Sequence, residues 1–129
     1  MAGLVKKAPK DGMDFLPNAR RIGAALMDFK AKNIKAFDVH ALTVLTDCII
    51  MCTVTSEPQL KAAYHGVRKA MSEIKVLPLQ AEGTFDSKWL VLDYGVILVH
   101  IFREDAFEFY GLDNLWGDAP AVDLGLDDL

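Results

Sequence analysis

Three residue types in this 129-residue chain could form a nucleophilic active site. Cys48 or Cys52 would supply the nucleophile, His100 the general base and Asp93 the carboxylate that orients it. Nothing in the spacing brings the cysteines to the histidine, and neither lies at a strand-to-helix elbow. Both lie in one apolar, strand-like run, about 13 Å apart, which is too far for a disulfide or a shared metal. We expect them to be small core side chains.

A second possible chemistry is metal-dependent nucleotidyl transfer, which needs paired carboxylates beside a turn of the Gly-Ser type. Asp38 and Asp47 are the candidate acids, but they fall on separate predicted strands without such a turn. Gly83, Gly95 and Gly111 stand singly, so no glycine-rich loop is predicted to hold phosphate. The histidines and cysteines do not follow zinc-ligand spacing. The sequence therefore predicts no catalytic residue, no metal and no cofactor.

Length and composition favour one domain of ordinary size. Hydrophobic residues make up 52% of the chain, and no apolar run approaches the ~20 residues of a membrane-spanning helix. No secretory signal is recognisable at the N-terminus, so we expect a cytoplasmic protein. The net charge is −4, and the four acids of residues 117–129 account for it. The other residues together carry no net charge, and this lack of basic charge predicts little direct nucleic-acid binding.

The positions of apolar residues predict the elements that hold these side chains. Ile22, Ala25, Leu26 and Phe29 have helical spacing, and Ser56 is a suitable N-cap for a second helix. We expect helices over 17–32 and 57–74, strands over 36–41, 47–55, 77–81, 88–93 and 96–102, and a short helix within 103–116. This order indicates an α/β (α+β) domain with a single mixed sheet of about five strands flanked by helices. We expect a mobile leader over 1–14, the domain over 15–117 and a solvated acidic tail over 118–129.

The last two predicted strands form a hairpin with two unlike faces. Counting outward from a Tyr94–Gly95 loop pairs Trp89 with His100. One face is purely aliphatic and is typical of a core beneath helices: Leu90, Leu92, Ile97, Val99 and Ile101. The other face mixes aromatic, acidic and imidazole side chains: Trp89, Val91, Asp93, Val96, Leu98, His100 and Phe102. Such a mixture is common at the centre of protein interfaces. The alternative is that helices cover both faces and His100 is a satisfied core histidine.

Residues 89–102, WLVLDYGVILVHIF, resemble the signature hairpin of the ribosome silencing factor (Iojap-like) family. Residues 109–116, FYGLDNLW, resemble its closing helix. The family's middle section is similar to Thr46-Asp47, the apolar strand that follows and Thr55-Ser56. Its first strand resembles Asp38-Val39. The resemblance covers residues 17–119 and is most specific where the hairpin and closing helix occur together.

The resemblance implies a translational repressor that binds the large ribosomal subunit through large-subunit ribosomal protein 14. Such a protein blocks small-subunit joining by steric exclusion. It also implies a fold similar to a nucleotidyltransferase core without the catalytic apparatus, and a homodimer when free. The partner-binding residues are then expected to be Trp89, Asp93, Tyr94, Gly95, His100, Phe102, Tyr110 and Trp116. The alternatives are a small nucleotidyltransferase-like enzyme and a homodimeric module with another partner.

Four positions depart from the family pattern. Val54 replaces a common glycine, Gln59 a common histidine, Val96 a common acid and Phe107 a common basic residue. These changes put polar contacts at the hairpin turn and at the start of the second helix in doubt, while the aromatic positions are retained.

Overall fold

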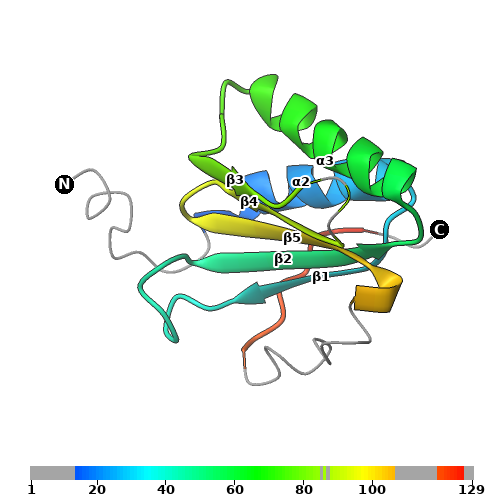
Figure 1. Cartoon of the computed structure of the whole chain (residues 1–129). Helices are drawn as coiled ribbons and strands as arrows, with labels where there is room; N and C mark the ends of the chain where they lie inside the picture. The colour runs from blue at the N-terminus through cyan, green and yellow to red at the C-terminus, as the bar shows by residue number, and fades with distance from the viewer. Residues whose placement is uncertain (1–13, 85, 87, 107–118, 127–129) are drawn as a thin grey trace.

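The computed structural model describes residues 14–84, 86, 88–106 and 119–126 (Figure 1). A five-stranded sheet has the order β1-β2-β5-β4-β3. Its strands are β1 (Lys32–Asp38), β2 (Cys48–Val54), β3 (Gln80–Glu82), β4 (Trp89–Asp93) and β5 (Ile97–Arg103). β2 and β5 are parallel, and the other pairs are antiparallel. The predicted single mixed sheet is confirmed.

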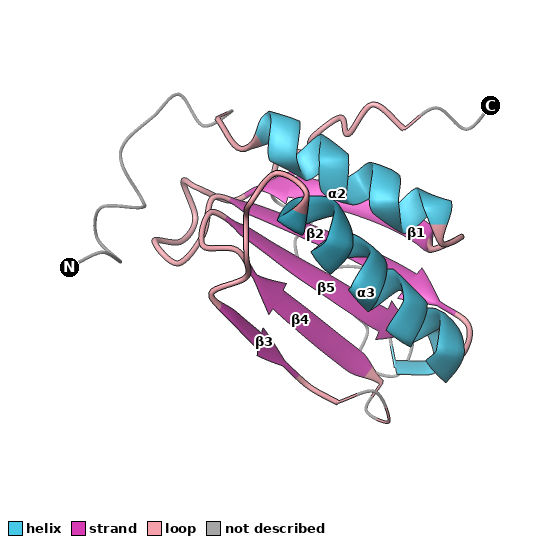
Figure 2. Ribbon diagram, turned by 90° about the horizontal axis from the view of Figure 1, so that it is seen from above, coloured by secondary structure: helices cyan, strands magenta, loops and turns pink. Residues whose placement is uncertain are grey.

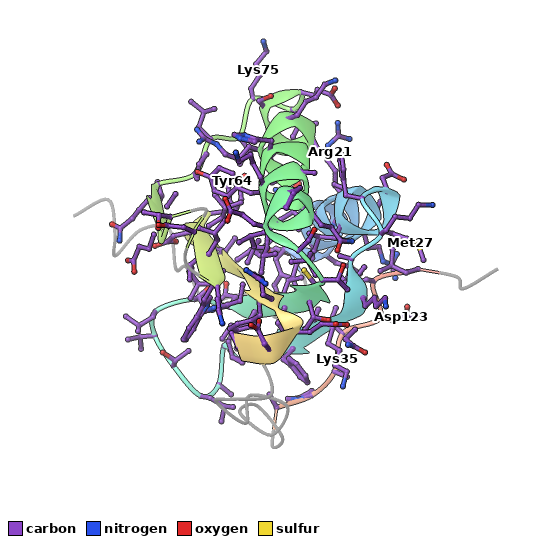
Figure 3. All side chains as sticks on the ribbon, turned by 45° about the vertical axis from the view of Figure 1, so that its right-hand side comes forward. Arg21, Met27, Lys35, Tyr64, Lys75 and Asp123 are labelled. Carbon is purple, nitrogen blue, oxygen red and sulfur yellow. The ribbon has the colours of Figure 1, made fainter. Side chains whose placement is uncertain are left out.

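The two long helices, α2 (Leu16–Asp28) and α3 (Glu57–Ser72), lie side by side on one face of this sheet (Figure 2). The main core fills the space beneath them. Arg21 of α2 ties the helices together: its Nε donates to the carbonyl of Ala70 at 2.7 Å, and its Nη2 lies 3.1 Å from Glu73 Oε1 (Figure 3). Within the described residues, neither helix is long and apolar enough to cross a membrane.

Strand β2 lies between β1 and β5 and is buried along its whole length. Cys48 and Cys52 point toward the helices and are fully buried, so their predicted place in the core is confirmed. Burial raises the pKa of each thiol to about 12, and the nearby charges of Asp38 and Asp47 add to this effect at Cys48. Val54, the first family departure, is a fully buried core residue.

The start of α3 explains what Gln59 does in place of the common histidine. Ser56 is the N-cap, and its Oγ accepts from the backbone N–H of Gln59 at 3.1 Å. The side-chain oxygen of Gln59 accepts from the backbone N–H of Thr55 at 2.7 Å. Its amide nitrogen donates to the carbonyls of Phe29 and Lys30 at 3.0 and 2.9 Å. Gln59 therefore fastens the end of α2 to the start of α3.

Several element boundaries differ from the prediction. The first helix ends at Asp28 rather than near residue 32, because Lys30 adopts a left-handed φ of 67° and turns the chain into β1. β1 consequently begins at Lys32 rather than at 36. β3 begins at Gln80, and residues 76–79 are irregular. Of the predicted helix within 103–116, the structure describes only residues up to 106.

Residues 119–126 pack against the domain, so the expectation of a solvated tail is wrong for this part of the chain. The Asp38 N–H donates to the Pro120 carbonyl, and the Val122 N–H donates to the Ala36 carbonyl, at 2.9 and 2.8 Å. This segment runs along the free edge of β1 and then reaches α2, where Leu124 is buried beside Gly23 (Figure 1). Two backbone groups of the β1 edge, the N–H of Asp38 and the carbonyl of Ala36, are thereby satisfied.

Candidate functional site

The β4–β5 hairpin turns one residue later than predicted. Trp89 pairs with Phe102, and the Tyr94 N–H donates to the Ile97 carbonyl at 2.8 Å, so the loop is Gly95–Val96. Gly95 has a φ of 87°, which a glycine adopts readily and a tyrosine does not. The predicted Tyr94–Gly95 loop is therefore wrong, and Trp89 and His100 are diagonal rather than direct neighbours.

This shift preserves the division of the hairpin into two faces, because each partner moves by two positions along its strand. Leu90 and Leu92 lie under the helices as predicted. Tyr94 continues β4 on that same face and is buried in the main core, so it lies beneath the helices rather than in the hairpin loop. Burial raises the pKa of Tyr94 to about 12.

The opposite face of the sheet carries no long helix in the described part of the chain, where a short helical turn at residues 104–106 follows the end of β5 (Figures 1 and 2). A groove of about 440 Å³ lies on it. The residues that line this groove come from β3, β4, β5 and the β1–β2 connection: Leu45, Gln80, Glu82, Trp89, Val91, Asp93, Leu98 and His100. Three sequence-predicted site residues, Trp89, Asp93 and His100, therefore meet in one concave surface.

Aromatic side chains form one end of the groove. Trp89 contacts Phe102 with 4.9 Å between ring centroids and His100 with 5.8 Å. The indole Nε1 donates to His100 Nδ1 at 3.0 Å. Phe102 is fully buried beneath Trp89 together with Met51, so it supports the groove rather than lining it.

His100 is held in its neutral form. Burial lowers its pKa from 6.5 to about 4, because the charged imidazolium would lose hydration. At pH 7 the ring therefore carries no charge. His100 lines the groove, and one of its nitrogens is already bonded to Trp89. Its pairing with a partner stays a prediction.

The groove has an acidic side. Asp93 and Glu82 are among its lining residues, and none of the described residues that line it is a lysine or an arginine. Asp93 Oδ1 accepts from the Gly95 N–H at 2.8 Å and so also stabilises the turn. Gln80 donates to Glu82 Oε2 at 2.6 Å. An apolar wall beside two carboxylates suits a long aliphatic side chain that ends in a positive charge.

The remaining predicted site residues are placed as follows. Gly95 is buried at the hairpin turn and contributes its conformation rather than a surface. The side chain of Val96 is partly buried, and its carbonyl accepts from the N–H groups of Asp47 and Cys48. Tyr110, Trp116 and the family departure at Phe107 lie outside the described residues.

The enzyme chemistries weighed above do not assemble among the described residues. The cysteines face the helices and His100 faces the groove, so the sheet separates nucleophile from base. A catalytic thiol needs a lowered pKa, whereas both thiol pKa values here are raised. Asp38 Oδ1 lies 2.6 Å from Nδ1 of the exposed His40. Over the described ranges, no cluster of three or more potential metal-ligating side chains occurs.

Sequence reasoning missed Leu45, Gln80 and Glu82. Their places depend on how the β1–β2 connection and β3 lie against the hairpin, which a local pattern does not determine. One signal was available: Leu42, Val44 and Leu45 form an apolar run in a connection, and each is more than half exposed. An exposed apolar loop of this kind often marks an interaction surface.

Residues 13–128 match the profile of a family described as "Ribosomal silencing factor during starvation". The chain is 33% identical over 100 residues to ribosomal silencing factor RsfS of Halalkalibacterium halodurans, covering 78% of this chain and 86% of that protein. It is 28% identical over 118 residues to the chloroplastic protein Iojap of Arabidopsis thaliana, covering 92% of this chain and 49% of that one.

A solved structure has the same fold. A Chromobacterium violaceum protein superposes with a TM-score of 0.75 at 30% identity, over 81% of this chain and 88% of that one. The profile match spans nearly the whole chain, and the Halalkalibacterium halodurans relative aligns over 86% of its own length. The resemblance proposed from the hairpin is therefore confirmed: the chain belongs to the ribosomal silencing factor family.

Proposed function

We propose that this chain silences translation by binding the large ribosomal subunit through large-subunit ribosomal protein 14, which blocks small-subunit joining. Membership of the silencing factor family supports the ribosomal part of this proposal. The mechanism is steric exclusion in the cytoplasm, with no catalytic step and no cofactor. The protein acts by occupying a surface that the small subunit would otherwise cover.

The groove on the face opposite α2 and α3 is the observation that carries this proposal. Trp89, Val91 and Leu98 give it apolar area, and Asp93 and Glu82 give it negative charge. Ribosomal proteins are rich in lysine and arginine because they contact RNA phosphate. The aliphatic stem of such a residue would lie against the apolar wall, and its charged end would meet the carboxylates.

The charge of the chain supports a protein rather than RNA as the direct partner. Its net charge is −4, and the groove itself is acidic, so phosphate would be repelled. Docking on a basic ribosomal protein instead brings opposite charges together, which accelerates encounter and fixes orientation.

Binding to purified large-subunit ribosomal protein 14 tests the role of the groove. Asp93→Asn keeps an oxygen for the Gly95 N–H and removes the charge. We expect it to weaken binding about tenfold, since a hydrogen bond to a charged group contributes about 1.5–3 kcal/mol. Asp28→Asn, at an exposed acid outside the groove, is the matched control. Equal affinity of Asp93→Asn and the parent would count against the groove.

Two related proposals have their own tests. Light scattering of the free chain should give a homodimer that yields to a heterodimer when the ribosomal protein is added; a dimer that persists would contradict the ribosomal role. Incubation with nucleotides and divalent metal should give no product. Turnover that is lost in Asp38→Ala or Asp47→Ala would overturn the non-catalytic mechanism.

A further inference from the structure

Two neighbours fix the imidazole of His100 from different sides. Nδ1 lies 3.0 Å from Nε1 of Trp89, and the ring stacks on Phe102 with 9° between planes and 5.9 Å between centroids. The indole N–H is only a donor, so Nδ1 must accept. A neutral imidazole carries one proton, which then sits on Nε2. The contact with Trp89 therefore selects the tautomer of His100.

The same contact restrains Trp89. Its indole packs on Phe102 across the strand pair and is tilted 44° to the ring of His100. Packing on Phe102, at 43° between ring planes, does not direct the indole N–H toward any one atom. A directional hydrogen bond removes that freedom, because it requires the N–H to point at one nitrogen. The wall of the groove is then in place before a partner arrives.

We propose that His100 is a positioning residue, which holds the indole of Trp89 as the wall of the groove through its Nδ1, rather than a residue that pairs with the partner. The effect on affinity rests on the proposed function, whereas the pair itself belongs to the free protein. Preorganisation of this kind strengthens binding because less side-chain freedom is lost on association.

Nitrogen NMR of the free ¹⁵N-labelled protein observes the pair directly. We expect a coupling across the hydrogen bond between Trp89 Nε1 and His100 Nδ1, and ring shifts of the Nε2–H tautomer. Trp89→Phe identifies the indole signal, since the chain has two tryptophans. A Nδ1–H tautomer, or an indole N–H that exchanges with solvent as fast as a free indole, would overturn the proposal.

Two variants of His100 distinguish its role as a hydrogen-bond acceptor from its role as a packed ring. His100→Asn places an oxygen near the position of Nδ1, and His100→Phe keeps the ring area without an acceptor. We expect the indole N–H to stay protected from exchange in His100→Asn and to exchange faster in His100→Phe. Large-subunit binding should weaken roughly two- to tenfold in His100→Phe, the net worth of one hydrogen bond, and stay close to the parent in His100→Asn.

The outcomes distinguish this inference from the proposed function. If the parent binds large subunits and His100→Phe binds equally well, or if both variants weaken equally, the positioning role is wrong. If the parent itself does not bind, the proposed function fails. The indole exchange of the two variants then decides alone whether His100 positions Trp89.

Discussion

Replacing Trp89 by alanine tests whether this side chain anchors a partner. Its indole forms part of the groove wall and packs on Phe102 and His100. An interface aromatic of this kind is worth about 2–4 kcal/mol on truncation, or roughly 30- to 1000-fold in affinity. The same change also removes packing. Truncation of a buried tryptophan costs about 3–5 kcal/mol, and since Trp89 is only partly buried we expect about 2 kcal/mol.

The assay must therefore measure folding and binding together. Domains of this size are stable by about 5–15 kcal/mol, so Trp89→Ala should remain folded in urea titrations. Co-sedimentation with isolated large subunits should show the loss of affinity. Leu77→Ala, at an apolar residue that is 69% exposed and does not line the groove, is the control. A folded Trp89→Ala that co-sediments like the parent, or a Leu77→Ala that loses as much, would refute the assignment.

Three further predictions concern stability and reactivity. In Gly66→Ala the new Cβ would lie 2.2 Å from Phe29 Cε2, so we expect a loss of about 1–3 kcal/mol in chemical denaturation, relieved when Phe29 is also alanine. The pKa of His100 is about 4 in the folded protein, against an ordinary 6.5. The stability contributed by the neutral imidazole is therefore fully present above pH 6.5 and is lost as the pH falls toward 4. In urea titrations, the free energy of unfolding of the parent should fall by up to about 3 kcal/mol more than that of His100→Asn over this pH range. Native Cys48 and Cys52 should react with iodoacetamide roughly 1000-fold more slowly than in urea, since their thiol pKa values are raised to about 12.

Local patterns predicted the elements well because they depend on neighbours in the chain. The helical spacing of the apolar residues, the Ser56 cap and the strand alternation all act over a few residues. The division of the hairpin into an aliphatic and a mixed face survived the error in its loop. A shift by two positions keeps the strand side chains on their own faces. Tyr94 and Val96, on either side of Gly95, are the exceptions, because both pack against the main core.

The features that the sequence did not predict depend on contacts between segments that are distant in the chain. The pairing of residues 119–122 with the edge of β1 involves partners more than 80 positions apart, and nothing in the acidic composition of the tail indicates it. The burial of Phe102 likewise follows from Met51 on the neighbouring β2, which local alternation does not reveal. Gln59 was identified as a departure, but its bonds to the end of α2 became visible only when the helices were placed side by side.

Subunit joining tests the central claim most directly. Large subunits incubated with the chain, then mixed with small subunits and separated on a sucrose gradient, should remain as free subunits. The same experiment with Trp89→Ala should give joined ribosomes, as should a control without protein. Full joining in the presence of the folded parent chain, at concentrations where it co-sediments with the large subunit, would contradict silencing by steric exclusion.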